Sequence, residues 1–222
     1  MEVLVPTPAG EARITRLPAG GRRRATLVLG HGAGGGIDAP DLRALAAALP
    51  PGGVEVALVE QPWRVAGKRI APQPKVLDSG WVPVVEQVRR DAEGAQRGGP
   101  GRVPIIVGGR SAGARVACRT GQAAGAVGVL ALAFPLHPPG KPEKSRADEL
   151  LGSGLPTLIV QGATDPFGTA AEFPELPKTH RLVALPAGNH EFAVRKDQSP
   201  VLAALVDAVA GWIDDLVGAL GS

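Results

Sequence analysis

Sulfur-containing side chains are nearly missing from this sequence, which has one cysteine and one methionine. A single cysteine, Cys118, cannot form an internal disulfide, so we expect a reducing, cytoplasmic setting. Cys118 lies in an apolar stretch and is expected to be a small, buried hydrophobic side chain. The four histidines show none of the spacings typical of metal ligands. We therefore predict neither a metal site nor a cofactor.

An excess of charge is also missing. The chain has 24 basic and 21 acidic residues and a formal net charge of +3, which is too little to favour nucleic acid as a partner. The densest basic run, at 22–24, comes just before an expected strand. We interpret it as a solvent-exposed entry to that strand rather than as a phosphate-binding patch. Long apolar runs are missing as well. The longest, at 126–134, is too short to span a bilayer, and the N-terminus shows no signal-peptide pattern, so we expect no membrane insertion.

Glycine and proline, in contrast, are abundant, with 31 and 22 residues in a chain of 222. The apolar runs between them are regular, which indicates many tight connections rather than disorder. Strands are expected at 2–5, 12–17, 25–29, 54–59, from 103 to the 109–113 turn, 126–133, 156–160 and 180–185. Helices are expected from Asp38 to about 49, at 81–95, after Gly113, at 144–151 and 169–176, and from a cap at Ser199 with Pro200 in its first turn.

This alternation predicts an α/β fold: a mostly parallel central sheet with helices on both faces and an antiparallel edge formed by 2–5 and 12–17. The sequence contains no internal repeat or break in composition, so we expect one domain covering 1–222. The stretch 61–79 is long and irregular and carries no strong pattern. We interpret it as a functional loop that shapes a pocket, without a large cap domain.

The stretch 103–115 carries the motif on which the functional prediction depends. A buried strand runs into Gly109-Arg110-Ser111-Ala112-Gly113, which fits G-x-S-x-G, and a helix rich in small residues follows. Strand, sharp turn and helix form the context in which this pattern presents a nucleophilic serine. Glycines on both sides relieve the crowding of such a turn. We predict that Ser111 is the nucleophile of this elbow.

Two other strand ends carry residues that complete the chemistry of a serine nucleophile. Asp165 follows one strand and His190 follows the next, so the chain order is Ser111, Asp165, His190, as in triads of the α/β-hydrolase type. Parallel strands place their carboxyl ends at one edge of a sheet. His190 would then take the proton of Ser111, and Asp165 would orient the imidazole.

An oxyanion needs fixed hydrogen-bond donors. We expect one from the backbone N–H of Ala112 and a second from Ala33, with Gly34 as the fallback, in the glycine-rich loop 30–36. Gly34, Trp63 and Phe167 are further candidates for the substrate pocket.

Other polar residues near these positions are expected to be structural. His31 would order the oxyanion loop, and Arg110 and Arg115 would pair with carboxylates, although an acidic substrate is an alternative for these arginines. His137 and His180 are not expected to be catalytic.

With these motifs in place, the sequence resembles the α/β-hydrolase superfamily, in particular its small, lid-poor members related to dienelactone hydrolase. It is most similar to a group that includes a scaffold subunit of a histone acetyltransferase complex. Four runs carry this resemblance, at 30–34, 108–115, 136–140 and 161–168. The resemblance implies a serine hydrolase with the triad Ser111, Asp165 and His190. Ala112 stands where relatives often have Met or Gln.

The function expected is hydrolysis of a small carboxylic ester, thioester or lactone through an acyl-enzyme, with a small acyl compound as the partner and the oligomeric state left open. Two alternatives remain. The first is a non-catalytic scaffold with the same fold, since fold alone does not ensure turnover. The second is a dinucleotide-binding protein, because 30–35 fits G-x-G-x-x-G and Glu60 ends the next strand, where an acid that binds ribose would lie.

Overall fold

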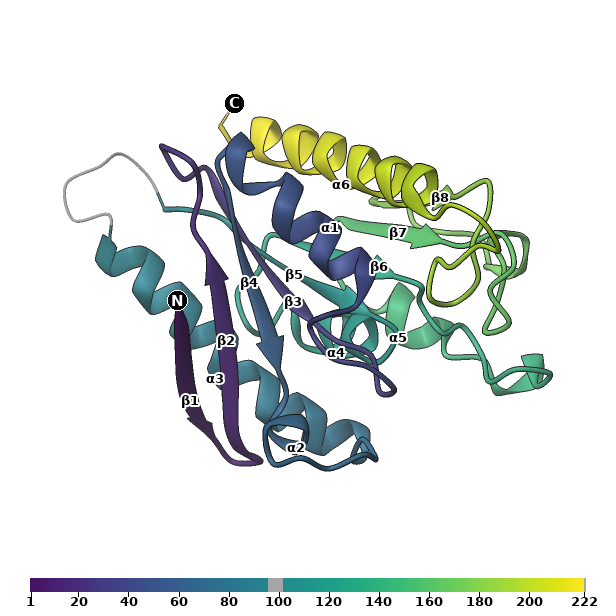
Figure 1. Ribbon diagram of the computed structural model, residues 1–222, viewed down its shortest axis with the longest axis horizontal. Coiled ribbons are helices and arrows are strands. Elements are labelled where there is room, and N and C mark those ends of the chain that lie inside the picture. Colours follow the sequence, from purple (N-terminus) through teal and green to yellow (C-terminus); the bar gives the residue numbers. More distant parts are fainter. Residues whose placement is uncertain (96–101, 222) are drawn as a thin grey trace.

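A computed structural model describes residues 1–95 and 102–221. Its strands form one sheet in the order β1-β2-β4-β3-β5-β6-β7-β8 (Figure 1). Their bounds are β1 Glu2–Thr7, β2 Gly10–Leu17, β3 Ala25–Gly30, β4 Val54–Glu60, β5 Ile105–Arg110, β6 Gly128–Leu132, β7 Thr157–Gln161 and β8 His180–Ala184. The pairs β1–β2 and β2–β4 are antiparallel, and the pairs from β4 onward to β8 are parallel. The predicted fold class, including the antiparallel N-terminal edge, is confirmed.

Helices cover both faces of the sheet (Figure 1). They are α1 Pro40–Ala48, α2 Pro62–Val65, α3 Pro74–Ala95, α4 Ala112–Thr120, α5 Ala147–Leu151 and α6 Ser199–Leu220, with short 3₁₀ turns η1 Pro50–Gly52, η2 Pro142–Lys144 and η3 Ala170–Glu172. Helices α1 and α6 pack together on one face, while α3, α4 and α5 lie on the other. None of these helices is long and apolar enough to cross a membrane.

The sheet separates two apolar clusters because neighbouring residues of a strand point to opposite faces. In β3, Leu27 belongs to the cluster under α1 and α6, whereas Val28 belongs to the cluster under α3 and α4. Both side chains are fully buried. A strand buried on both faces reads as a continuous apolar run, which is why the central strands were recognisable in the sequence.

The stretch 61–79 differs from its prediction. It is not an extended irregular loop, because α2 occupies part of it and α3 begins at Pro74 rather than near residue 81. Proline is favoured in the first turn of a helix, and Pro74 stands there. Pro83 lies inside α3, where it removes one backbone hydrogen bond, and the helix continues through it.

Three smaller boundaries also differ. The N-cap of α1 is Ala39, without a side-chain cap, so Asp38 does not have the predicted capping role. The N-cap of α6 is Gln198, and Ser199 is already helical. The helix predicted at 169–176 is only the short turn η3, which a capping box between Thr169 and Glu172 closes.

Candidate active site

Ser111 lies in a sharp turn between β5 and α4. Its backbone has φ 53° and ψ −112°, a conformation that residues other than glycine rarely adopt. The turn brings Gly109 and Gly113 against the end of β3, where a Cβ on Gly109 would lie 2.3 Å, and one on Gly113 2.5 Å, from the Gly30 carbonyl oxygen. Both glycines are therefore required by close backbone contact. The strained serine between them has the geometry of a nucleophile elbow.

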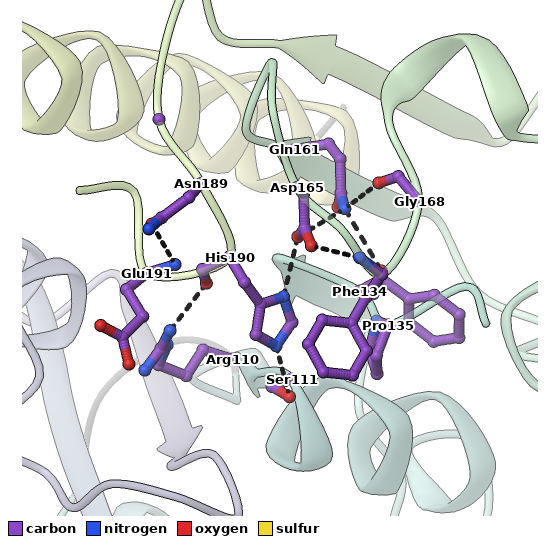
Figure 2. Close-up of polar contacts among 12 residues, drawn as sticks. Arg110, Ser111, Phe134, Pro135, Gln161, Asp165, Gly168, Asn189, His190 and Glu191 are labelled. Atoms are coloured by element: carbon purple, nitrogen blue, oxygen red, sulfur yellow. Dashed lines mark hydrogen bonds and ion pairs between the residues drawn. The ribbon is translucent and has the colours of Figure 1, made fainter. Parts of the chain in front are cut away.

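The structure brings the three predicted side chains together at the carboxyl edge of the sheet (Figure 2). Ser111 Oγ lies 2.9 Å from His190 Nε2. On the other side of the ring, His190 Nδ1 lies 2.8 Å from Asp165 Oδ2. The imidazole thus joins the hydroxyl to the carboxylate, and we call this hydrogen-bonded set the Ser111–His190–Asp165 relay.

Backbone and amide donors hold the Asp165 carboxylate in place. Its side chain is fully buried. The Phe167 backbone N–H donates to Oδ1 over 2.8 Å. Gln161 Nε2 donates to Oδ2 over 2.9 Å (Figure 2). Gln161 also donates to the Gly168 carbonyl over 2.7 Å, so it ties both ends of the 165–168 turn to β7. Sequence reasoning did not assign a role to Gln161, although its place at the end of β7 was visible.

The loop that carries His190 is anchored on both sides. Phe192 is fully buried and takes φ 55°. The ring of Phe167 lies over the imidazole with its centroid 4.2 Å away. Arg110 Nη2 donates to the His190 backbone carbonyl over 2.7 Å, so the residue next to Ser111 also positions the histidine (Figure 2).

Arg110 is itself held by a buried carboxylate. Its Nε lies 3.4 Å from Asp41 Oδ2, and the Asp41 side chain is fully buried in α1. Neither Asp41 side-chain oxygen has a hydrogen-bond donor within the described residues. Burial therefore raises the pKa of Asp41, and the Arg110 charge only partly offsets this effect. Asp41 was not recognised from the sequence, since only the packing of α1 against the elbow brings it there.

His31 has the structural role that the sequence predicted. Its Nδ1 lies 2.8 Å from the Gly32 carbonyl oxygen, and its Nε2 accepts a hydrogen bond from the Gln61 backbone N–H over 3.2 Å. These contacts fit a neutral ring protonated at Nδ1. Burial lowers the pKa of His31, consistent with that neutral form. The ring therefore ties the glycine-rich loop to the end of β4.

A cleft of about 330 Å³ opens at Ser111. The glycine-rich loop forms one wall, and the loops after β6, β7 and β8 form the others. The residues that line it are Gly32, Ala33, Gly34, Gly35, Arg110, Ser111, Ala112, Arg115, Pro135, Arg146, Phe167, His190 and Glu191. Both expected oxyanion residues, Ala33 and Ala112, are in this set. As the first residue of α4, Ala112 has a backbone N–H that no residue of the helix can accept.

Trp63, in contrast, does not line this cleft. It is buried in α2 with its ring edge-on to His31, 5.5 Å between centroids. It contributes instead to a separate pocket of about 300 Å³ beneath the β1–β2 turn, together with Lys68 and Ile70. Trp63 also borders a small space together with His31, Ala112 and Gly113. Its expected place in the substrate pocket, and the shaping of that pocket by 61–79, stay predictions.

Two other histidines form contacts away from the cleft. His180 Nε2 lies 3.2 Å from Ser153 Oγ, but it also lies 3.1 Å from the Leu150 carbonyl oxygen. A nitrogen that donates to a carbonyl cannot accept the serine proton. Within the described residues, the other ring nitrogen of His180 contacts the Thr179 hydroxyl and not a carboxylate. His137 lies 3.0 Å from Glu172 and braces two loops. Neither pair resembles a catalytic relay.

Comparison with known proteins agrees with this architecture. Residues 23–217 match the model of the family described as Alpha/beta hydrolase domain. The chain belongs to this alpha/beta hydrolase family. No curated protein gives a significant match. Within the described residues, no group of three His, Cys, Asp or Glu side chains is arranged to hold a metal ion.

Solved structures share the fold of this chain at low sequence identity. An alpha-beta serine hydrolase homologue from Coxiella burnetii is 16% identical, with a TM-score of 0.74 over 95% of this chain and 97% of that one. A serine hydrolase without a lid from Xanthomonas campestris is 20% identical, with a TM-score of 0.69 over 96% and 94%. Dienelactone hydrolase from Anabaena variabilis is 18% identical, with a TM-score of 0.70 over 96% and 95%.

Proposed function

We propose that this protein is a serine hydrolase that cleaves a small carboxylic ester, thioester or lactone. The observation that carries the proposal is the unbroken Ser111–His190–Asp165 relay at the mouth of the cleft. A serine hydroxyl is a weak nucleophile unless a base accepts its proton, and the 2.9 Å contact to His190 Nε2 supplies that base.

The first half of the reaction forms an acyl-enzyme. Ser111 Oγ attacks the substrate carbonyl carbon while its proton passes to His190 Nε2. The carbonyl π electrons move to oxygen, and the backbone N–H groups of Ala112 and Ala33 are proposed to stabilise that oxyanion. When the tetrahedral intermediate collapses, the bond to the leaving group breaks and His190 returns the proton to the departing oxygen or sulfur.

The second half releases the acid. A water molecule gives a proton to His190 Nε2 and attacks the acyl carbon, and the Ser111 Oγ–acyl bond then breaks with return of the proton to Oγ. Throughout, Asp165 Oδ2 holds the Nδ1–H tautomer of His190 and stabilises its transient positive charge. The buried donors on Asp165 fix the carboxylate in this orientation.

The substrate class rests on the openness of the site and on the relatives. No segment of the described residues covers the cleft as a separate domain, which suits a small, accessible acyl group. Proteins of this fold include dienelactone hydrolase from Anabaena variabilis, a thermophilic esterase from Thermogutta terrifontis, and Est1E from Butyrivibrio proteoclasticus, which has been solved with ferulic acid bound. These names support ester chemistry as the first class to test.

The test is turnover of a panel of esters, thioesters and lactones by the parent protein and by Ser111→Ala. We expect Ser111→Ala to lower kcat by about 10³-fold or more, because loss of the nucleophile removes the covalent route. Circular dichroism and thermal unfolding should show that the variant stays folded. No turnover of any panel member by the parent protein would favour the non-catalytic scaffold instead.

The dinucleotide alternative is less well supported by the contacts. Glu60, the expected ribose-binding acid, is paired with Arg13 on β2 over 3.1 Å. The glycine-rich loop also does not lead directly into a helix, since α1 begins only at Pro40. Titration with NAD(P) by calorimetry checks this alternative: tight binding without turnover would contradict the hydrolase proposal.

A further inference from the structure

We infer that the substrate carries a negative charge close to the scissile bond, and that Arg146, supported by Arg115, binds it. This inference rests on the proposed function, because it names the class of ester that the same site takes. A carboxylate on the ester is the chemistry that fits these side chains.

Arg146 is placed at the wall of the cleft without an acidic partner. It lines the cleft together with Ser111 and Ala112. Its Nη1 donates to the Pro135 carbonyl over 2.9 Å, which fixes the side chain beside another residue of that wall. Among the described residues, Arg146 forms no ion pair, since Glu149 pairs with Arg115 and Arg119 instead. A guanidinium has five N–H donors, so most of this group stays available to a ligand.

The arginines next to it use up the nearby carboxylates. Glu149 accepts two hydrogen bonds from Arg115, at 2.7 and 2.6 Å, and a third from Arg119 at 2.9 Å. Asp78 accepts the remaining contacts of Arg119. These three arginines and two carboxylates carry one more positive than negative charge, and Arg146, which lines the cleft, is the arginine of the three without an ion pair.

Arg115 and Arg146 are close enough to affect one another. Burial and, after it, the neighbouring Arg115 charge lower the pKa of Arg146, and the Glu149 charge offsets them only in part. Two like charges held together cost free energy unless an anion relieves the repulsion. Arg115 stands one turn into α4, whose N-terminal end also favours negative charge. The Arg146 charge, the Arg115 charge and the N-terminal end of α4 thus all favour an anion on the same side of the cleft.

The wall of the cleft that carries Glu191 sets the orientation of the charged ester. Glu191 is exposed and lies on the far side of His190 from Pro135 (Figure 2). Its carboxylate would repel an anionic group there. The charged end of the ester should therefore point toward the wall of Pro135 and Arg146, and this arrangement would disfavour the reversed binding mode.

The test compares pairs of similar esters in which one member carries a carboxylate and the other is neutral. One pair is the p-nitrophenyl monoester of glutaric acid against p-nitrophenyl pentanoate, which places the charge on the acyl group. A second pair is 4-carboxyphenyl butanoate against its methyl ester, which places it on the alcohol. We expect the parent protein to prefer the anionic member of at least one pair in kcat/KM. Arg146→Gln should lower that preference about tenfold to a hundredfold, mainly through KM.

Two variants sharpen the result. Arg146→Lys keeps the charge and should retain part of the preference, whereas Lys144→Gln removes a positive charge from the same loop, outside the cleft, and should leave it unchanged. Salt should weaken the preference of the parent protein, because mobile ions screen an exposed charge.

Labelling of Ser111 by a neutral fluorophosphonate, with and without glutarate, distinguishes a wrong anion assignment from a wrong proposed function. We expect glutarate to slow labelling of the parent protein but not of Arg146→Gln. Normal labelling with no charge preference in either pair and no protection by glutarate would overturn the anion assignment alone. If Ser111 of the parent protein is not labelled at all, both the assignment and the proposed function are contradicted.

Discussion

At the scale of single residues, the position of His190 depends on the buried ion pair between Arg110 and Asp41. Arg110 holds the His190 backbone carbonyl, and Asp41 holds Arg110. Removing one partner of a buried pair leaves the other charge without compensation, which costs about 3–5 kcal/mol. The pair therefore affects stability and histidine position through different contacts, and the two effects can be separated.

We predict that Arg110→Met lowers the free energy of unfolding by about 3–5 kcal/mol and lowers kcat by about tenfold to a hundredfold, because His190 loses its backbone anchor. The double variant with Asp41→Asn should recover most of the stability but not kcat, since the buried charge is gone while the anchor is still missing. Urea unfolding and ester kinetics measure the two effects. Equal recovery of kcat in the double variant would show that Arg110 does not act through His190.

His31 provides a prediction on pH. Its pKa in the folded protein is below the ordinary value of 6.5, so the unfolded chain binds more protons near that pH. The contribution of His31 to stability is therefore fully present above pH 6.5 and is lost as the pH falls through the folded pKa. The difference in unfolding free energy between the parent and His31→Gln should shrink from about pH 8 to about pH 5, as measured by urea unfolding.

His137 serves as the opposite case in the same experiment. The Pro138 carbonyl and, after it, the Glu172 carboxylate raise the pKa of His137 above its ordinary value, although partial burial acts against them. Its contribution is present below pH 6.5 and is lost as the pH rises through the folded pKa. The difference in unfolding free energy between the parent and His137→Gln should therefore shrink as the pH rises, the opposite of the trend for His31→Gln. If the two differences in unfolding free energy changed with pH in the same direction, the pKa directions of His31 and His137 would be contradicted.

The candidate site could be predicted at this scale only where a residue has a local signal. Ser111, Asp165 and His190 each follow an apolar strand, so their place at one edge could be derived from the chain. Asp41 and Gln161 have no such signal, because their roles come from contacts with residues far along the chain. Trp63 likewise has no local signal for where its ring lies: it follows the end of β4 and packs edge-on against His31.

At the scale of elements, the nucleophile elbow is defined by close packing of β3, β5 and α4. Gly113 lies against the Gly30 carbonyl, so Gly113→Ala should lower the unfolding free energy by more than about 2 kcal/mol, because neither backbone segment can move without disturbing the sheet. Thermal and urea unfolding measure the loss.

Gly211 in α6 is the matched control, since a Cβ there meets nothing within 4 Å. Gly211→Ala should raise the unfolding free energy by about 0.5–1 kcal/mol, as expected when a helical glycine without contacts is replaced. Similar losses for both alanine variants would mean that backbone contact does not set the glycine requirement of the elbow.

The elements were predictable where periodicity was strong and misjudged where proline dominated. The buried strands and α6 follow from continuous or helical apolar patterns. Helix α3 was predicted too short because 61–79, with its prolines, was interpreted as an irregular loop. Packing of Trp81, Val84 and Val88 in the core holds the helix on both sides of Pro83.

At the scale of the whole molecule, the arrangement of the sheet converts distance along the chain into proximity. Strands β5, β7 and β8 end at the same edge, so three residues separated by 54 and 25 positions meet in one relay. The mostly parallel sheet and its edge strands were derivable from the alternation of elements. The order of strands in space was not, because it depends on which apolar faces pack together and not on local pattern.

The most direct test of this account is labelling of the intact protein with a fluorophosphonate, followed by mass spectrometry of the peptides. The account predicts one adduct, on Ser111, which disappears in Ser111→Ala and forms much more slowly in His190→Ala, since the imidazole activates the hydroxyl. Absence of an adduct on the parent protein, or an adduct on another serine such as Ser153 with Ser111 unmodified, would contradict it.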